Sequence, residues 1–156
     1  MKRSLGFIVA MSFVLGSLGK AAETHAPPLT TPIIQKVLSA AVAKAQALGV
    51  PMGVAIVDAG GNLVGFLKME GASVHTNYTA QAKAYTAASI RKPTHESGIP
   101  SDIADEIASA TGGRFTKLPG GFPLILDGKT IGGIGVGGGN GEQDIAVAKA
   151  GAEALK

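Results

Sequence analysis

A glycine-rich segment in the last third of the chain restricts the fold most strongly. Two apolar runs, 118–126 and 129–136, are joined by Asp127-Gly128, a pair that readily adopts the positive φ angles of a tight hairpin turn. Six glycines then occur between positions 132 and 139. Because glycine has no Cβ, another backbone or a ligand can approach this stretch very closely. The segment therefore predicts an antiparallel hairpin that ends in a glycine-rich elbow, 132–139.

The rest of the chain predicts helices packed on an antiparallel sheet. Apolar residues recur at helical spacing after Thr31, which is expected to be the N-cap, and Gly49 is expected to end that helix. Ser101-Asp102 is expected to cap a shorter helix. The expected helices are 31–48, 75–90, 101–110 and 142–155, and the expected first hairpin pairs strands 52–57 and 63–69. Two hairpins among helices indicate the α+β class, with an antiparallel sheet covered by helices in an α/β sandwich.

The glycine-rich elbow contains G-x-G-x-x-G at Gly133, Gly135 and Gly138. A dinucleotide site is not supported, because the preceding strand is the second arm of a hairpin and no βαβ unit follows. Two interpretations stay open for the elbow. Its N–H groups form an anion-binding nest at a helix start, or its glycines allow close packing of a strand against a helix or a second subunit. Glu142 and Asp144, in the first turn of the last helix, are expected to repel an anion.

The N-terminal residues have the pattern of a secretory signal peptide. Lys2 and Arg3 precede an apolar run, 7–18, and Gly19-Lys20-Ala21 places small residues at a suitable cleavage site. The apolar run is too short to span a bilayer comfortably, so we expect export to the periplasm or medium without stable membrane insertion of the mature form. An uncleaved membrane anchor is the alternative. The expected division is a signal peptide at 1–21, a linker at 22–30 and one domain at 31–156.

Charge and composition exclude several functional classes. The net charge of +3 is carried by Lys2, Arg3 and Lys20, all in the expected leader, so the mature domain is neutral and nucleic-acid binding is not expected. The chain has no cysteine, which excludes disulfides, thiolate catalysis and cysteine-ligated metals. No hydrolase, zinc-protease or kinase motif is present. Binding is therefore predicted over catalysis, and any turnover would depend on a bound cofactor.

Two of the three histidines are candidate metal ligands. His25 lies in the proline-rich linker, which leaves His75 and His95. A neutral imidazole is a frequent axial ligand of haem iron, although histidines are also common as surface or capping residues. His75 and Thr79 are expected to share a helix face with Ala82, whereas Lys83 is expected to project elsewhere.

The order and spacing of several motifs resemble those of the haem-degrading GlcG/HbpS-like family. The motifs are 53–58 with Gly60-Gly61-Asn62-Leu63, 68–72, 83–87, the segment 118–144 and 148–151. The resemblance covers the chain after the leader. It implies a profilin-like sandwich, haem as the ligand, assembly into homo-oligomers, and a ligand pocket between subunits that the elbow lines. Lys68 and Glu70 stand where the family usually has arginine and aspartate, so the fine geometry of that block differs.

The resemblance also implies a set of site residues. Pro93-Thr94 matches a step whose threonine is associated with haem binding, so Thr94 is expected near the iron, although its hydroxyl is also suited to capping the turn. Arg91 and Lys92 are suited to pairing with the haem propionates or to stabilising a helix C-terminus. The complete expected set is His75, Arg91, Lys92, Thr94, His95, Gly137 and Gly138, with His75 and His95 as alternative ligands of the iron.

These observations predict an exported haem-binding protein that acts in haem sequestration, sensing or degradation. One alternative is a non-haem structural accessory subunit of a small-molecule catabolic pathway of the glycolate or propanediol type. The other is a corrinoid-binding module, because related domains occur fused to cobalamin adenosyltransferases.

Overall fold

The computed structural model describes residues 29–156, so the expected signal peptide, His25 and all of the expected linker before position 29 lie outside the described residues. The elements in chain order are α1 (Thr31–Leu48), β1 (Gly53–Asp58), β2 (Leu63–Lys68), α2 (Thr76–Ile90), the 3-10 helix η1 (Thr94–Glu96), α3 (Ser101–Ala110), β3 (Gly121–Leu126), β4 (Lys129–Gly137) and α4 (Gly141–Glu153). No helix within 29–156 has the length and hydropathy needed to cross a bilayer.

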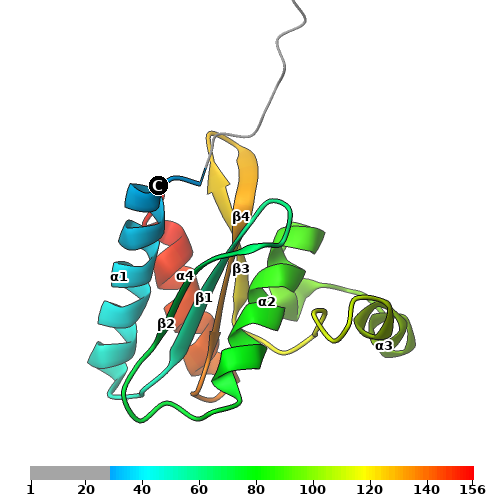
Figure 1. Ribbon diagram of the computed structural model, residues 1–156, viewed down its shortest axis with the longest axis horizontal. Coiled ribbons are helices and arrows are strands. Elements are labelled where there is room, and N and C mark those ends of the chain that lie inside the picture. Colours follow the sequence, from blue (N-terminus) through cyan, green and yellow to red (C-terminus); the bar gives the residue numbers. More distant parts are fainter. Residues whose placement is uncertain (1–28) are drawn as a thin grey trace, which may run out of the picture.

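The four strands form one antiparallel sheet with the order β2-β1-β4-β3. Helices α1 and α4 pack on one face and α2 packs on the other, as Figure 1 shows. Alternate residues of β1 divide between the two faces, with Ile56 in the core under α1 and α4 and Ala55 in the core under α2. The predicted α+β sandwich with an antiparallel sheet is confirmed.

The two cores differ in the size of their side chains. The core under α1 and α4 contains the large residues Met52, Ile56, Leu124 and Ile134. The core under α2 consists of Ala55, Val57, Ala80, Ala84 and Ala88. Small residues on both partners place α2 unusually close to the sheet.

Glycines of β4 make this close approach possible. A Cβ atom on Gly135 would overlap the carbonyl oxygen of Ala80, and one on Gly133 would overlap that of Ala84. The α2 backbone therefore lies directly on the β4 backbone. This supports the close-packing interpretation for the part of the elbow that belongs to the strand.

The predicted β3–β4 turn has the expected geometry. Asp127 has φ 50° and Gly128 has φ 74°, so both central residues of the two-residue turn are left-handed. The first hairpin turn is held by Asp58, whose Oδ1 accepts hydrogen bonds from the N–H groups of Gly60 (2.8 Å) and Asn62 (2.9 Å). Partial burial of this carboxyl raises its pKa, but the accepted hydrogen bonds outweigh burial and lower the pKa below 3.8.

Several predicted helix ends are wrong by one or two residues. The N-cap of α1 is Thr30, not Thr31, because the Thr30 carbonyl already accepts the hydrogen bond from Ile34 N (3.0 Å) and Pro32 lies in the first helical turn. Gly49 ends α1 with φ 67°, as predicted. The N-cap of α3 is Pro100, and neither Ser101 nor Asp102 caps it.

The last helix begins earlier and ends earlier than predicted. Its N-cap is Asn140, whose side chain accepts a hydrogen bond from Gln143 N (2.9 Å), while the Gln143 side chain accepts one from Asn140 N (2.9 Å). This reciprocal capping box starts α4 at Gly141. The helix ends at Glu153, before Leu155.

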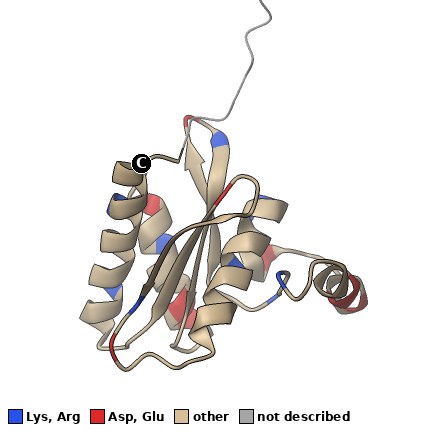
Figure 2. Cartoon of the chain, in the orientation of Figure 1, with Lys and Arg blue, Asp and Glu red and all other residues tan. Residues whose placement is uncertain are grey.

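Helix α3 stands away from the body of the domain in Figure 1. It is attached through Ala104, which is buried, while Ile103 is 49% exposed. Figure 2 shows acidic residues along this helix, and Asp102, Asp105 and Glu106 are all exposed. This cluster is a solvated helix face.

We expect Gly135→Ala to destabilise the domain by about 3 kcal/mol, because the added methyl group would force α2 away from β4. Urea unfolding followed by circular dichroism measures this change. Gly60→Ala is the matched control, because a Cβ there meets only the side chains of Asp58 and Asn62 in the turn and should cost less than about 1 kcal/mol. Equal stability of the two variants would contradict the proposed backbone contact.

Candidate functional site

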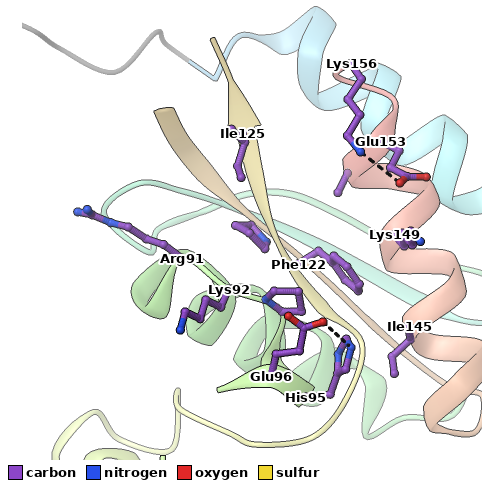
Figure 3. Close-up of a pocket in the computed structure, with 13 residues that line it drawn as sticks. Arg91, Lys92, His95, Glu96, Phe122, Ile125, Ile145, Lys149, Glu153 and Lys156 are labelled. Carbon is purple, nitrogen blue, oxygen red and sulfur yellow. Dashed lines mark hydrogen bonds and ion pairs between the residues drawn. The ribbon is translucent and has the colours of Figure 1, made fainter. Parts of the chain in front are cut away.

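One cavity of the described residues, called here the His95 cavity, has a volume of about 490 Å³. It lies along the outer edge of β3, between the end of α2 with η1 and the outer side of α4 (Figure 3). Its apolar wall consists of Pro93, Phe122, Pro123, Ile125, Ile145 and Ala152, and its charged residues are Arg91, Lys92, Glu96, Lys149, Glu153 and Lys156. Its volume is typical of ligand pockets.

The backbone at the end of α2 places His95 in this cavity. Arg91 ends α2 in the left-handed region with φ 55°, while its N–H still bonds to Ala87 O (3.0 Å). Only glycine adopts this conformation without cost, so a left-handed arginine stores a small strain, as is common near functional sites. The chain then reverses, and Pro93 begins the short helix that carries His95.

The His95 imidazole lies against an aromatic wall and beside a carboxylate. Its ring centroid is 5.7 Å from that of Phe122, with a tilt of 51°. Its Nε2 is 3.4 Å from Glu96 Oε1, and the His95 side chain is 31% exposed. In Figure 3 both side chains face the cavity, whereas Arg91 extends away from the imidazole. The His95 imidazole is therefore a partly exposed group in the wall of the cavity.

Thr94 is buried beside the cavity and does not line it. The side chain is 1% exposed, its hydroxyl donates to Leu118 O (2.8 Å), and the same oxygen accepts from Gly121 N (3.1 Å). The Thr94 hydroxyl therefore uses both its donor and its acceptor function on backbone groups that lie far from it in the sequence. Thr94 therefore positions the start of β3, the strand that carries Phe122. The expected contact of Thr94 with haem stays a prediction.

A second cavity, called here the His75 cavity, has a volume of about 240 Å³. It is lined by His75, Thr79, Lys83, Leu118, Pro119, Gly137, Gly138, Gly139, Gly141 and Asp144. The structure thus divides the expected site residues. Arg91, Lys92 and His95 line the first cavity, and His75, Gly137 and Gly138 line the second.

The predicted helix face of His75 is partly wrong. Thr79 and Lys83 line the same cavity as His75, whereas Ala82 lines a different hollow, next to Tyr78 and Tyr85. Residues at i, i+4 and i+8 follow one stripe of a helix, so the spacing alone was sufficient to place Lys83 with His75. The expectation that Lys83 projects elsewhere overlooked this spacing.

Lys83 forms a buried ion pair with Asp144. The distance from Lys83 Nζ to Asp144 Oδ2 is 2.7 Å, and the two side chains are 5% and 6% exposed. Lys83 Nζ also donates to Val136 O (2.7 Å), and Asp144 Oδ1 accepts from Gly139 N (3.0 Å). The expectation that Asp144 repels an anion is therefore wrong, because its charge is compensated by Lys83.

We expect Asp144→Ala to cost about 3–5 kcal/mol of unfolding free energy, because it leaves the Lys83 ammonium buried without a counter-charge. The double variant Lys83→Met/Asp144→Leu should recover at least half of this loss, since no charge then stays buried. Urea unfolding of the two variants tests the effect. A double variant as unstable as the single one would show that packing, and not the unpaired charge, dominates.

We expect Thr94→Val to cost about 1–3 kcal/mol, because it leaves Leu118 O and Gly121 N without a partner in a buried region. Thr94→Ser keeps the hydroxyl and should cost only about 1 kcal/mol for the lost methyl group. Thermal unfolding of both variants measures the difference. If Ser and Val were equally destabilising, the hydroxyl would not hold this segment.

Within residues 29–156 there is no group of three or more His, Asp or Glu side chains arranged to hold a metal ion.

The protein matches a family model described as haem-degrading protein HbpS-like over residues 29–153. This match covers most of the chain and begins at Leu29, which packs against the core under α1 and α4. The chain belongs to the HbpS-like family.

Individual relatives agree with this assignment. The chain is 37% identical over 127 residues to an uncharacterized 15.0 kDa protein in the dhaT-dhaS intergenic region of Citrobacter freundii, covering 78% of this chain and 87% of that protein. It is 36% identical over 132 residues to the corrinoid adenosyltransferase PduO of Salmonella typhimurium, covering 77% of this chain but 38% of PduO. The crystal structure of a PduOC:haem complex aligns with a TM-score of 0.74 at 33% identity, covering 83% of this chain and 96% of that one.

Proposed function

We propose that this protein binds haem in the His95 cavity, with the His95 imidazole as the iron ligand. The observation that carries this proposal is the combination of a reachable nitrogen donor, an apolar wall and several cations in one cavity. Membership of a haem-degrading family and the similarity to a PduOC:haem complex support the choice of ligand. Sequestration, sensing and degradation are all compatible with such a site.

Each part of the cavity has a physical role toward a porphyrin. Phe122 and Ile145 offer apolar surface on β3 and α4, which favours burial of a flat hydrophobic ring. Glu96 lies close enough to orient the imidazole of His95. Bound haem iron would supply redox and oxygen chemistry, while these residues hold the ring and limit access of water.

The cations around the cavity suit the two propionates. Lys92 comes from the end of α2, and Lys149 projects from α4 on the opposite side (Figure 3). Lys156 is already paired with Glu153 at 3.2 Å, so Lys149 is the better partner on that helix. Lys149 was not among the residues expected from sequence, because a lysine late in a helix is also explained by the helix dipole.

We also propose that the mature protein is exported and assembles with copies of itself. Export rests on the charged and apolar pattern of residues 1–21. Assembly is supported by the edge strand β2, on which Leu63, Val64, Phe66 and Leu67 are each more than a third exposed. Such an apolar edge favours pairing or packing with another protein surface.

We expect titration of the leaderless protein with hemin to give a saturable Soret shift, and His95→Ala to abolish it or weaken binding by at least tenfold. His75→Ala is the matched control, because the imidazole it removes lines the other cavity. Visible absorption measures both variants. Absence of a Soret shift in the parent protein would overturn haem binding, whereas loss in His75→Ala alone would move the ligand to the other cavity.

The similarity to PduO favours one second candidate, a corrinoid ligand. The shared segment is a minor part of PduO, so its adenosyltransferase activity does not transfer to this chain by similarity alone. Visible absorption after incubation with cobalamin distinguishes the two ligands. A cobalamin shift in the parent protein, without a hemin shift, would favour the corrinoid module.

A further inference from the structure

A third cavity, called here the Tyr85 cavity, shares no lining residue with the His95 cavity or the His75 cavity. It lies between the β1–β2 turn, the side of α2 that carries Tyr78 and Tyr85, and the segment 112–114 that follows α3. Its volume of about 360 Å³ is within the range of small-molecule sites. We infer that this cavity binds a small aromatic carboxylate, that is, a single ring that carries a carboxylate group.

Arg114 is the charged residue of this cavity, and its guanidinium group is held on the face of the Tyr85 ring. The Arg114 Cζ atom is 4.5 Å from the ring centroid, which is the distance of a cation–π contact. Arg114 Nε also donates a hydrogen bond to Thr111 O (3.3 Å). The ring is itself fixed by the β1–β2 turn, because a Cβ on Gly61 would lie only 2.7 Å from Tyr85 Cδ2. The guanidinium group is therefore preorganised, so binding a ligand costs little conformational entropy.

The terminal nitrogens of Arg114 are left for a ligand. Within residues 29–156 the guanidinium group donates through Nε alone and forms no ion pair with a carboxylate. No aspartate or glutamate lines the cavity, so its lining carries one uncompensated positive charge. Asp58, in the nearby turn, has both carboxylate oxygens bonded to Gly60 and Asn62. An arginine with free terminal N–H groups binds a carboxylate through two parallel hydrogen bonds, which sets the anionic part of the ligand.

The aromatic part of the ligand follows from the two tyrosines. Tyr78 and Tyr85 are seven residues apart on α2, so both side chains lie on the same side of the helix. Tyr78 is 77% exposed, so its ring faces are free to contact a ligand. An aromatic ring stacks favourably on another ring or on a guanidinium plane, and both are present here. Further apolar surface comes from Val57, Leu63 and Ala82.

The remaining wall favours a single ring over a porphyrin. Gly112 and Gly113 have φ 64° and 80°, and no atom lies within 4 Å of the position that a Cβ would take on either residue. This side of the cavity is therefore open to a ligand. No histidine lines the cavity, so it offers no imidazole to an iron atom, and its volume is smaller than that of the His95 cavity.

The test uses the fact that Tyr78 and Tyr85 are the only tyrosines of the chain. The leaderless protein, labelled with ¹³C on its tyrosine rings, then gives two ring signals, both from this cavity. We expect titration with benzoate at constant ionic strength to shift both signals saturably. Acetate, which lacks the ring, and benzyl alcohol, which lacks the charge, should each bind about tenfold more weakly. Absence of a saturable shift with benzoate, or equal affinity for either of the other probes, would overturn the proposal.

Arg114→Gln is the diagnostic variant, because it removes the guanidinium charge from an exposed side chain and should leave the fold intact. We expect it to weaken benzoate binding by about tenfold, in line with the loss of a hydrogen bond to a charged group. Lys117→Gln is the matched control, since it removes one positive charge from an exposed residue three positions along the chain that does not line the cavity. Equal affinity in both variants would overturn the proposal. Hemin binding is measured at the His95 cavity, so haem and benzoate binding succeed or fail separately.

Discussion

The contact between the α2 backbone and the β4 backbone is the constraint on which the Lys83–Asp144 pair and the His75 cavity depend. Gly133 and Gly135 leave no space for a Cβ beneath Ala84 and Ala80, so α2 is fixed close to the sheet. At this distance Lys83 reaches the carbonyl of Val136 and the carboxylate of Asp144 at the start of α4. A larger residue on β4 would lift the helix and separate that pair, which lines one cavity directly.

The ion pair in turn connects α2, the end of β4 and the first turn of α4. Asp144 holds Gly139 through its second oxygen, so the path of the elbow into α4 is set by a residue that is itself held from α2. A buried pair of this kind is often no more stabilising than apolar residues of similar size, because desolvation offsets the attraction. Its use here is to fix one geometry for the elbow.

The sequence was sufficient for the local parts of this structure and insufficient for the contacts between distant ones. The Asp127-Gly128 turn, the Gly49 helix end and the antiparallel sandwich all follow from local backbone preferences or from hydrophobic period. Lys83 and Asp144 are 61 positions apart, and each has an ordinary local explanation, so their pairing depends on the packing of α2 on β4. The predicted helix starts differ from the observed ones where a proline or a capping box, and not the expected residue, defines the first turn.

The division of His75 and His95 between two cavities follows from the length of α2. His75 precedes the first turn of α2 and His95 follows its last turn, so the two imidazoles start at opposite ends of a 15-residue helix. Such a helix is about 22 Å long, farther than one iron atom can span between two nitrogen donors of the same chain. Within one copy of this chain, therefore, at most one of these histidines can ligate a given iron, and the apolar wall beside His95 favours that one for a porphyrin. The smaller His75 cavity is lined mostly by glycines and polar side chains, with Leu118 and Pro119 as its apolar residues.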